Sequence, residues 1–392
     1  MKSRLPKRRI NPIYFFHWLV LIILSVSLLG PLPIVLAQTP VPLSKIQAVL
    51  DTMTPEERVG QLFLVTFQGT DTSEESQIRD LISNHHVGGV VLLAENDNFI
   101  AEPDTIPGAH QLVNALQSIE WETTASFSEN TYVPLFVGIS QEGDGAPNDQ
   151  VLSGLTAMPN LMAIGATWNT DFAKQMGMVM GSELSILGCN LFLGPSLDVL
   201  ESPNPSAQID LGTRVFGGDP FWVGEMGRAY IAGLHTGSRR QMMVVAKHFP
   251  GRGSSDRAPE LEIATVPKTL EQLRLIELAP FFAVTDSIDP ANLVDGLLVS
   301  HIRYQGFQGN IRATTRPVSF DPAALSDIIA LPEFANWRQN GGLIVSDALG
   351  SQAVRNFYSQ GGETFSPRFV AQDAFLAGND LLYLGNITSD EA

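Results

Sequence analysis

Short apolar runs recur along the whole chain, and the stretches between them carry helical signals. Apolar runs without polar alternation are typical of parallel strands that helices cover on both faces. Eight such strand–helix units predict a closed (β/α)8 barrel of the TIM type rather than an open sheet. The expected strands are residues 63–67, 87–93, 135–139, 191–193, 243–246, 297–299, 343–345 and 381–384.

The competing architecture is a doubly wound sheet. Sheets of that kind that bind nucleotides carry Gly-x-Gly-x-x-Gly after the first strand or Gly-x-x-x-x-Gly-Lys, and the sequence has neither motif. Two helix starts are also visible. Residues 54–57 (Thr-Pro-Glu-Glu) place an N-cap before a proline and two acids, and residues 269–272 (Thr-Leu-Glu-Gln) fit a capping box.

The eighth expected strand ends at Leu384, and the sequence ends soon afterwards at Ala392. A barrel normally needs a helix after its last strand to cover the junction between the last and first strands. One hypothesis is therefore a barrel truncated after strand eight. A longer parent reading frame would confirm it, and a stop codon after Ala392 would refute it.

Composition narrows the class of protein. Of the 392 residues, 44% are hydrophobic and 17% charged, which excludes a disordered acidic protein and a coiled coil. The 24 Lys and Arg against 41 Asp and Glu give a net charge of −17, which argues against a nucleic-acid partner. The single cysteine, Cys189, excludes an internal disulfide and a cysteine-based zinc site. No metal or nucleotide motif is present, so we expect no cofactor.

The first 37 residues have the three-part layout of a secretory signal. A basic start precedes an apolar run from Trp18 to Leu29, and Val35-Leu36-Ala37 is a small-residue cleavage pattern. The alternative is an uncleaved anchor over residues 13–29, at the lower limit of a spanning helix. We expect an exported, extracellular or cell-envelope protein, with a lead-in segment over 38–50 and the barrel over 51–392. A membrane is expected as a partner only through the N-terminal segment.

Polar side chains stand at the ends of five consecutive expected strands, where a (β/α)8 barrel carries its active groups. In chain order they are Ser140-Gln141-Glu142, Asp198, Lys247-His248, His301 and Asp347. Each residue taken alone is compatible with a solvated loop position, and His301 equally with a histidine packed under the loops. Together they predict a site at the barrel mouth.

Two carboxylates in this region suit hydrolysis of a glycosidic bond. Asp347 follows a strand and is therefore held rigidly, whereas Glu260 lies on a Gly- and Pro-rich loop that we expect to be mobile. Glycosidases need one carboxylate that stays ionised and another that holds a proton. The structural alternatives are an N-cap role for Asp347 and a surface loop charge for Glu260.

Seven motifs occur in order at residues 53–63, 141–143, 194–199, 214–220, 247–253, 346–349 and 377–380. The strongest is Lys-His-Phe-Pro-Gly-Arg-Gly at 247–253. Together they resemble glycoside hydrolase family 3, in particular its bacterial β-N-acetylglucosaminidase branch, over about Lys45 to Asn386. The resemblance implies the family's barrel domain, with Asp347 as the nucleophile. It also implies that Asp198, Arg214, Lys247 and His248 grip the sugar in the −1 subsite. Glu142 and His301, at neighbouring strand ends, are further candidates for substrate binding.

Three departures from that branch matter. Its loop carries Asp-Ser-His with the histidine as acid/base, but the corresponding triplet here is Ala258-Pro259-Glu260. We therefore expect Glu260 to be the acid/base, with Glu262 and Asp256 as alternatives. Ser140 stands where the branch has an aspartate, and no arginine follows nearby. Arg252 replaces the second histidine of the loop.

The expected activity is hydrolysis of β-linked N-acetylhexosamine, or of related β-glycosides, with retention of configuration. The expected partner is a carbohydrate, for example an amino sugar derived from cell wall. In a closed site the two carboxyl groups should lie roughly 5–5.5 Å apart. One alternative is β-glucosidase or β-xylosidase specificity on the same barrel. Another is a catalytically impaired sugar-binding barrel, which the altered triplet and Ser140 favour.

Overall fold

A computed structural model describes residues 43–125, 132–143, 145–201, 211–287, 289–360, 362 and 364–388. The expected signal segment over residues 1–37 lies outside the described residues. The helix α2 (Leu43–Thr52) occupies most of the segment that we expected to be a lead-in. Within the described ranges, no helix combines the length and apolar character that crossing a bilayer requires.

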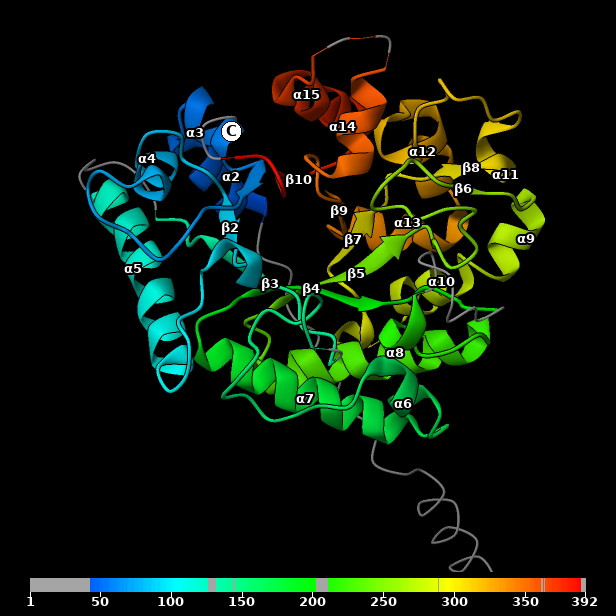
Figure 1. The fold of residues 1–392 in the computed structure, drawn as a ribbon, viewed down its shortest axis with the longest axis horizontal. Coiled ribbons are helices and arrows are strands. Elements are labelled where there is room, and N and C mark those ends of the chain that lie inside the picture. Colours follow the sequence, from blue (N-terminus) through cyan, green and yellow to red (C-terminus); the bar gives the residue numbers. More distant parts are fainter. Residues whose placement is uncertain are drawn as a thin grey trace, which may run out of the picture. The chain divides into compact units, whose positions relative to one another are not determined.

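Eight parallel strands form the central sheet, in the order β10-β1-β2-β3-β4-β5-β7-β9 (Figure 1). A parallel bridge between Val345 and Leu381 links the two outer strands and closes the ring. The predicted (β/α)8 barrel is therefore confirmed, and the doubly wound sheet is excluded. The strands are β1 (Phe63–Val65), β2 (Gly89–Val91), β3 (Phe136–Ile139), β4 (Leu191–Ser196), β5 (Met243–Phe249), β7 (Gly296–Val299), β9 (Leu343–Ser346) and β10 (Leu382–Tyr383).

Helices lie between the strands along the chain and cover the outer face of the barrel (Figure 1). They are α3 (Pro55–Gly60), α4 (Gln77–Ser83), α5 (Thr105–Ala125), α6 (Leu161–Gly165), α7 (Thr170–Ile186), α8 (Pro220–Gly237), α9 (Leu270–Leu275), α10 (Ala279–Thr285), α11 (Gln305–Gln308), α12 (Pro322–Ile329), α13 (Pro332–Gln339), α14 (Gln352–Tyr358) and α15 (Pro367–Ala377). Short 3-10 turns are η1 (Ala94–Asn96), η2 (Gly212–Arg214), η3 (Pro290–Asn292) and η4 (Val318–Phe320).

Both predicted helix starts are confirmed. The Thr54 side chain accepts a hydrogen bond from the Glu57 backbone N–H at 3.1 Å, and the Glu57 carboxylate accepts one from the Thr54 N–H at 2.7 Å. Thr269 and Gln272 form the same reciprocal pair at the start of α9. Capping of this kind satisfies N–H groups that have no partner inside the helix.

Two strands were not expected from the sequence, because each is only two residues long and shows no periodicity. They are β6 (Thr265–Val266) and β8 (Arg303–Tyr304), which pair in parallel outside the barrel. β6 belongs to the long connection after β5, and β8 follows β7. The pairing fixes the far end of the connection that carries Glu260.

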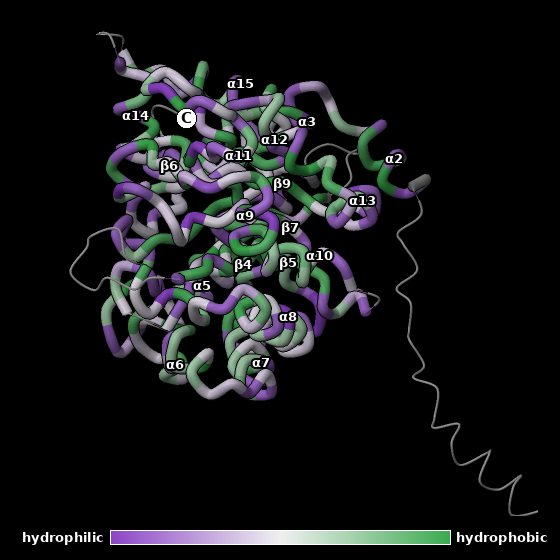
Figure 2. Tube along the Cα trace, turned by 90° about the vertical axis from the view of Figure 1, so that its right-hand side faces the viewer, coloured by the Kyte–Doolittle hydropathy of each residue, from purple (hydrophilic) through white to green (hydrophobic). Residues whose placement is uncertain are grey.

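The barrel has separate inner and outer cores because successive strand residues face opposite sides of the sheet. On β5, Val244 and Ala246 pack outward against the helices, whereas Val245 packs inside the barrel. Figure 2 shows the apolar residues concentrated in the centre of the fold, around β4 and β5. Tyr383 belongs to the inner core on β10.

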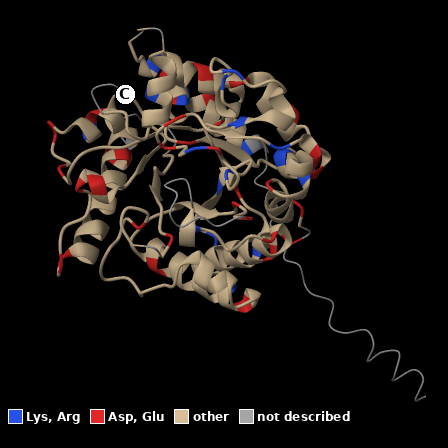
Figure 3. Ribbon diagram, turned by 45° about the vertical axis from the view of Figure 1, so that its right-hand side comes forward, with Lys and Arg blue, Asp and Glu red and all other residues tan. Residues whose placement is uncertain are grey.

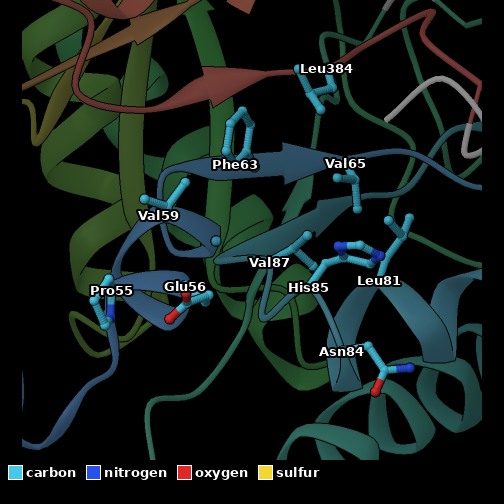
Figure 4. A pocket seen from close by; sticks show the side chains of 11 residues that line it. Pro55, Glu56, Val59, Phe63, Val65, Leu81, Asn84, His85, Val87 and Leu384 are labelled. Carbon is cyan, nitrogen blue, oxygen red and sulfur yellow. The ribbon is translucent and has the colours of Figure 1, made fainter. Parts of the chain in front are cut away.

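One cavity lies on the outer surface of the barrel. It measures about 420 Å³ and lies between α3 and α4, where Val59, Phe63, Leu81 and His85 line it (Figure 4). None of the strand-end residues that predict the active site contributes to its lining. This cavity is therefore separate from the barrel mouth.

Candidate active site

The end of β5 places two functional side chains in the strand itself. The register between β5 and β7 shifts between Ala246 and Phe249, so the segment containing Lys247 and His248 forms a bulge. A bulge changes the direction in which side chains point. Lys247 reaches the end of β3 and His248 reaches the residues that follow β4. Figure 3 shows basic and acidic segments together in the centre of the ring.

Glu142 links three elements of the barrel mouth. It follows β3 and is almost fully buried. Its carboxylate accepts hydrogen bonds from Arg214 Nε at 2.7 Å and Arg214 Nη2 at 3.1 Å, and it lies 2.5 Å from Lys247 Nζ. Burial opposes ionisation, but the charges of Lys247 and Arg214 outweigh it and hold the pKa of Glu142 well below its usual range.

Lys247 also donates to Ser140 Oγ at 2.9 Å. Burial lowers the pKa of Lys247, while the charges of Glu142 and Asp347 raise it. Ser140, which replaces the family's aspartate, therefore takes one of the ammonium hydrogens. The three predicted residues Glu142, Arg214 and Lys247 form a single paired cluster.

Asp198 is fully buried behind His248. Its Oδ2 accepts from His248 Nδ1 at 2.7 Å and from Ser196 Oγ at 2.8 Å, and its Oδ1 accepts from the Arg252 backbone N–H at 2.7 Å. Burial opposes ionisation, but the charges of His248 and Arg252 lower the pKa of Asp198 to about 2. The resemblance implies that Asp198 grips the sugar; its complete burial indicates instead that it acts through His248.

His248 is held in one tautomer by this arrangement. The carboxylate of Asp198 can only accept, so Nδ1 carries the hydrogen. Burial and the charge of Arg252 lower the pKa of His248, and the charge of Asp198 raises it. No described residue forms a hydrogen bond with its Nε2. The ring is therefore neutral, and Nε2 is left as an acceptor for a sugar hydroxyl.

Asp347 follows β9 and is half-buried. Its backbone N–H donates to Val299 O at 3.1 Å, and its Oδ1 accepts from the Ala348 N–H at 2.8 Å. The helix that follows, α14, has Ser351 at its N-cap position, so Asp347 is not a helix cap. Burial opposes ionisation, but His301, His248 and Arg252 lower the pKa of Asp347. It is therefore a carboxylate at the barrel mouth.

His301 supports this carboxylate from below. Its Nδ1 lies 2.8 Å from Ser319 Oγ, its Nε2 lies 3.1 Å from Ala348 O, and its ring stacks on Phe320 with centroids 5.1 Å apart. Burial lowers the pKa of His301. Both ring nitrogens already have partners, so His301 packs against the segment that follows Asp347, which fits the alternative of a histidine packed under the loops.

The loop after β5 carries Glu260, whose carboxylate forms an ion pair with Arg252. Glu260 Oε1 lies 2.9 Å from Arg252 Nη1, and 56% of the Glu260 side chain is exposed. Burial opposes ionisation, but the charges of Arg252, His248 and Arg214 lower the pKa of Glu260. Glu260 thus lies beside Arg252, and in this conformation its lowered pKa favours an ionised carboxylate over a proton donor.

The two alternative acids lie elsewhere on the loop. Arg257 lies 3.0 Å from both Asp256 Oδ2 and Glu262 Oε2, and Asp256 also accepts from the Thr265 N–H at 2.7 Å. They line a cavity of about 540 Å³ between the loop and α14, together with Arg303 and Phe357. These contacts tie Asp256 and Glu262 to the loop itself, so the geometry favours Glu260.

Three residues were missed. Asp149 accepts from the backbone N–H groups of Glu142, Gly143 and Gly145 and so fixes the turn after β3. Tyr383 lies where the charges of Asp347 and Glu95 act on its hydroxyl. Arg252 was noted only as a departure from the motif, although its place between Lys247-His248 and Glu260 was a usable signal. The other two carry no signal in the local sequence.

Metal binding finds no support in the part of the chain that the structure describes. There, no three His, Cys, Asp or Glu side chains are grouped as a metal site. Cys189 is buried, and burial raises the pKa of its thiol to about 12. It therefore offers no thiolate ligand at neutral pH.

Comparison with known proteins decides the family. The Glycosyl hydrolase family 3 N terminal domain matches residues 54–389. The chain belongs to glycosyl hydrolase family 3. This match covers every strand of the barrel and every candidate site residue, and it confirms the resemblance seen in the motifs.

Three similar proteins show how much of a relative this chain covers. Beta-hexosaminidase A of Pseudoalteromonas piscicida is 26% identical over 79% of this chain and 48% of its own length. The "Beta-N-acetylglucosaminidase/beta-glucosidase" of Cellulomonas fimi is 28% identical over 88% of this chain and 54% of its own. A solved family 3 β-N-acetylglucosaminidase from Paenibacillus sp. has a TM-score of 0.66 and 27% identity, over 85% of this chain and 55% of its own. The chain thus spans about half the length of each.

Proposed function

We propose that the chain hydrolyses β-linked N-acetylhexosamine with retention of configuration. The observation that carries the proposal is the Asp347 carboxylate on a rigid strand end, beside His301, His248 and Arg252, with a pKa below its usual value. The names of the relatives from Pseudoalteromonas and Paenibacillus support the same substrate class.

In the first step, an Asp347 carboxylate oxygen attacks the anomeric carbon, the bond to the departing oxygen breaks, and Glu260 gives that oxygen a proton. In the second step, Glu260 takes a proton from water, the water oxygen attacks the anomeric carbon, and the bond to Asp347 breaks. Two displacements return the original configuration. The chain needs only these two carboxylates for the covalent chemistry.

The β3–β5 strand ends hold the sugar ring. Lys247 and Arg214 offer N–H donors to ring hydroxyls or to the 2-substituent, and His248 Nε2 offers an acceptor. Hydrogen bonds that tighten as the oxocarbenium-like state develops stabilise the transition state more than the substrate. Because Glu142 and Asp198 already orient these groups, little reorganisation accompanies binding.

Glu260 has to change its state before it can act as an acid. In the structure it is paired with Arg252, which favours the ionised form. We infer that an arriving sugar separates Glu260 from Arg252 and shields its carboxyl group from water. Both changes raise a carboxyl pKa, so Glu260 takes up a proton as the site closes.

The test uses the mature chain with aryl and alkyl β-N-acetylglucosaminides. Asp347→Asn should lower turnover by at least about 10³-fold while leaving the melting temperature unchanged. Glu260→Gln should lower kcat/KM for the alkyl glycoside by roughly 10²-fold or more and spare kcat/KM for a dinitrophenyl glycoside, whose leaving group needs no proton in the first step. The first product should be the β-anomer; an α-anomer would exclude Asp347 as nucleophile.

Specific observations favour two other functions. The Glu260–Arg252 ion pair is what a sugar-binding barrel without an acid would show, and a lack of turnover on a broad panel of glycosides would support that function. The double name of the Cellulomonas protein favours β-glucosidase activity, which equal turnover of aryl glucoside would support. A structure with bound sugar would show whether a 2-acetamido group finds a place.

We further propose export, on the basis of the basic start, the apolar run and the cleavage pattern in residues 1–37. Sequencing the N-terminus of the secreted protein should find Gln38. A start at Met1 in a membrane fraction would favour the anchor instead.

A further inference from the structure

The loop that carries Arg252 and Glu260 is closed at its base by one buried carboxylate. Ser254 lies near the start of the loop and Lys268 lies at its end. Ser254 Oγ and Lys268 Nζ each donate to the same oxygen, Glu277 Oε1, and both distances are 2.7 Å. Glu277 lies on the connection between α9 and α10. A single side chain therefore joins the two ends of the loop.

Contacts on the other sides of the loop converge on the same place. Gly251 has a φ of +116°, and a Cβ there would lie 2.7 Å from the Glu277 Cβ. A Cβ at Gly253 would meet the backbone oxygen of Val199 at 1.9 Å. Lys268 also forms an ion pair with Glu201, in the connection after β4. The Gly-rich turn is thus enclosed between Glu277 and the residues that follow Asp198.

Burying the carboxylate of Glu277 costs free energy that an apolar side chain in its place would not cost. The residue is completely buried, and its Oε2 has no hydrogen-bond partner among the described residues. Burial raises the pKa of Glu277 although Lys268 and Ser254 lower it. Replacing a buried ionic group with apolar side chains is often neutral or stabilising, and an unpaired buried polar atom calls for an explanation.

We propose that Glu277 is a positioning residue that closes the base of the loop and holds Glu260 over the glycosidic oxygen. The inference rests on the proposed function for the role of Glu260, but the closure of the loop is a separate structural claim. Glu277 touches neither the sugar nor the reacting atoms. Its effect passes through Ser254 and Lys268 to the geometry of the loop.

A positioning role of this kind can be recognised from kcat/KM, which reports the first step of the reaction alone. If the contacts of Glu277 with Ser254 and Lys268 are lost, Glu260 is displaced, and proton donation to the departing oxygen becomes slower. The nucleophile on β9 and the sugar grip on β3–β5 belong to other elements and stay in place. The kcat/KM should therefore fall for glycosides whose leaving group needs a proton and should persist for those whose leaving group does not.

The experiment compares the full mature chain with Glu277→Gln and Ser254→Ala. Glu333→Gln is the matched control, because the ion pair of Glu333 is with Arg274 of α9 and not with a residue of the loop. Amide hydrogen exchange is measured over residues 255–264 and over β3, β4 and β9. The kcat/KM is measured with an alkyl and a dinitrophenyl β-N-acetylglucosaminide.

We expect both loop variants to exchange the 255–264 amides about 10-fold faster, with unchanged exchange in the barrel strands. The kcat/KM for the alkyl glycoside should fall by at least about 10-fold, and that for the dinitrophenyl glycoside by less than about 3-fold. Unchanged loop exchange in both variants, or an equal loss for both glycosides, would overturn the proposal. If Glu277→Gln does not fold, Ser254→Ala decides alone, because it removes only one hydroxyl.

The two proposals can fail independently. If the wild-type chain turns over neither glycoside, the proposed function fails, and loop exchange still decides whether Glu277 closes the loop. If the wild type is active but loop exchange does not respond, the positioning role fails alone.

Discussion

The two halves of the candidate active site are built differently. At the ends of β3–β5, Glu142, Asp198, Lys247 and His248 are buried and paired with one another at 2.5–2.7 Å. On the loop after β5, more than half of the Glu260 side chain is exposed, and its partner is the single arginine Arg252. Under the proposed function, the first half is already arranged to bind the sugar, whereas Glu260 in the second half is paired in a way that favours its ionised form.

For the proposed reaction, the difference separates the charges that stay fixed from the group that changes its protonation state. Charges that must stay fixed are placed on strands, where neighbouring strands neutralise them and burial strengthens their interactions. The group that must change its protonation state is placed on a loop, where it can move between solvent, arginine and substrate. Substitutions in the two halves should therefore have different signatures: loss of stability in the first, and altered pH dependence in the second.

The largest effect is expected for Glu142→Gln in the strand-end half. Lys247 and Arg214 would lose their shared counter-charge and repel each other in a buried place. Breaking a buried ion pair costs about 3 kcal/mol, so the free energy of unfolding in urea should fall by that amount, and kcat/KM by roughly 100-fold. A loss below about 1 kcal/mol would show that water reaches the cluster.

Acid should weaken the same half through Asp198. Its pKa is lowered to about 2 in the folded state, so its contribution is complete above the unfolded value near 3.9 and fades as the pH falls toward 2. The contribution amounts to about 2 kcal/mol. Asp198→Asn should therefore be less stable than wild type at pH 6, and the gap should narrow by pH 3 in thermal melts. A constant gap would contradict this.

Much of the strand-end half could be predicted from the sequence because its information is local. Apolar runs mark the strands, and parallel strands place their carboxyl ends at one mouth, so Glu142, Lys247 and Asp347 were expected together. The sequence could not show how deeply each of these side chains is buried. Asp198 and His301 sit at the predicted strand ends, but packing places one behind His248 and the other beneath Asp347.

The loop half was harder to predict because its contacts are between residues with no common periodicity. The triplet Ala258-Pro259-Glu260 pointed to an acid on this loop, but the sequence could not show that Arg252 would pair with it. Nor could it show that Glu277, in a different connection, would join the two ends of the loop. Such contacts depend on tertiary geometry alone.

Removing the partner of Glu260 should shift the pH profile. In Arg252→Met the Glu260 pKa should rise, because the nearest charge that lowers it is gone. Glu260 then stays protonated to higher pH, and the alkaline limb of kcat/KM for an alkyl glycoside should move up by about one pH unit. The acid limb should also rise, because Arg252 helps to ionise Asp347. If neither limb moves, Arg252 does not influence the pKa of either carboxylate.

The smallest effect is expected for the two other acids of the loop. Asp256 and Glu262 are held by Arg257, and both side chains belong to the exposed part of the loop. Exposed ion pairs contribute little, so Asp256→Asn and Glu262→Gln should each change kcat/KM by less than about twofold. A loss of turnover in either variant that matched Glu260→Gln would transfer the acid/base role to that residue. Such a reassignment of the acid/base role would not change the roles proposed for the strand-end half, because none of its contacts involves Arg257.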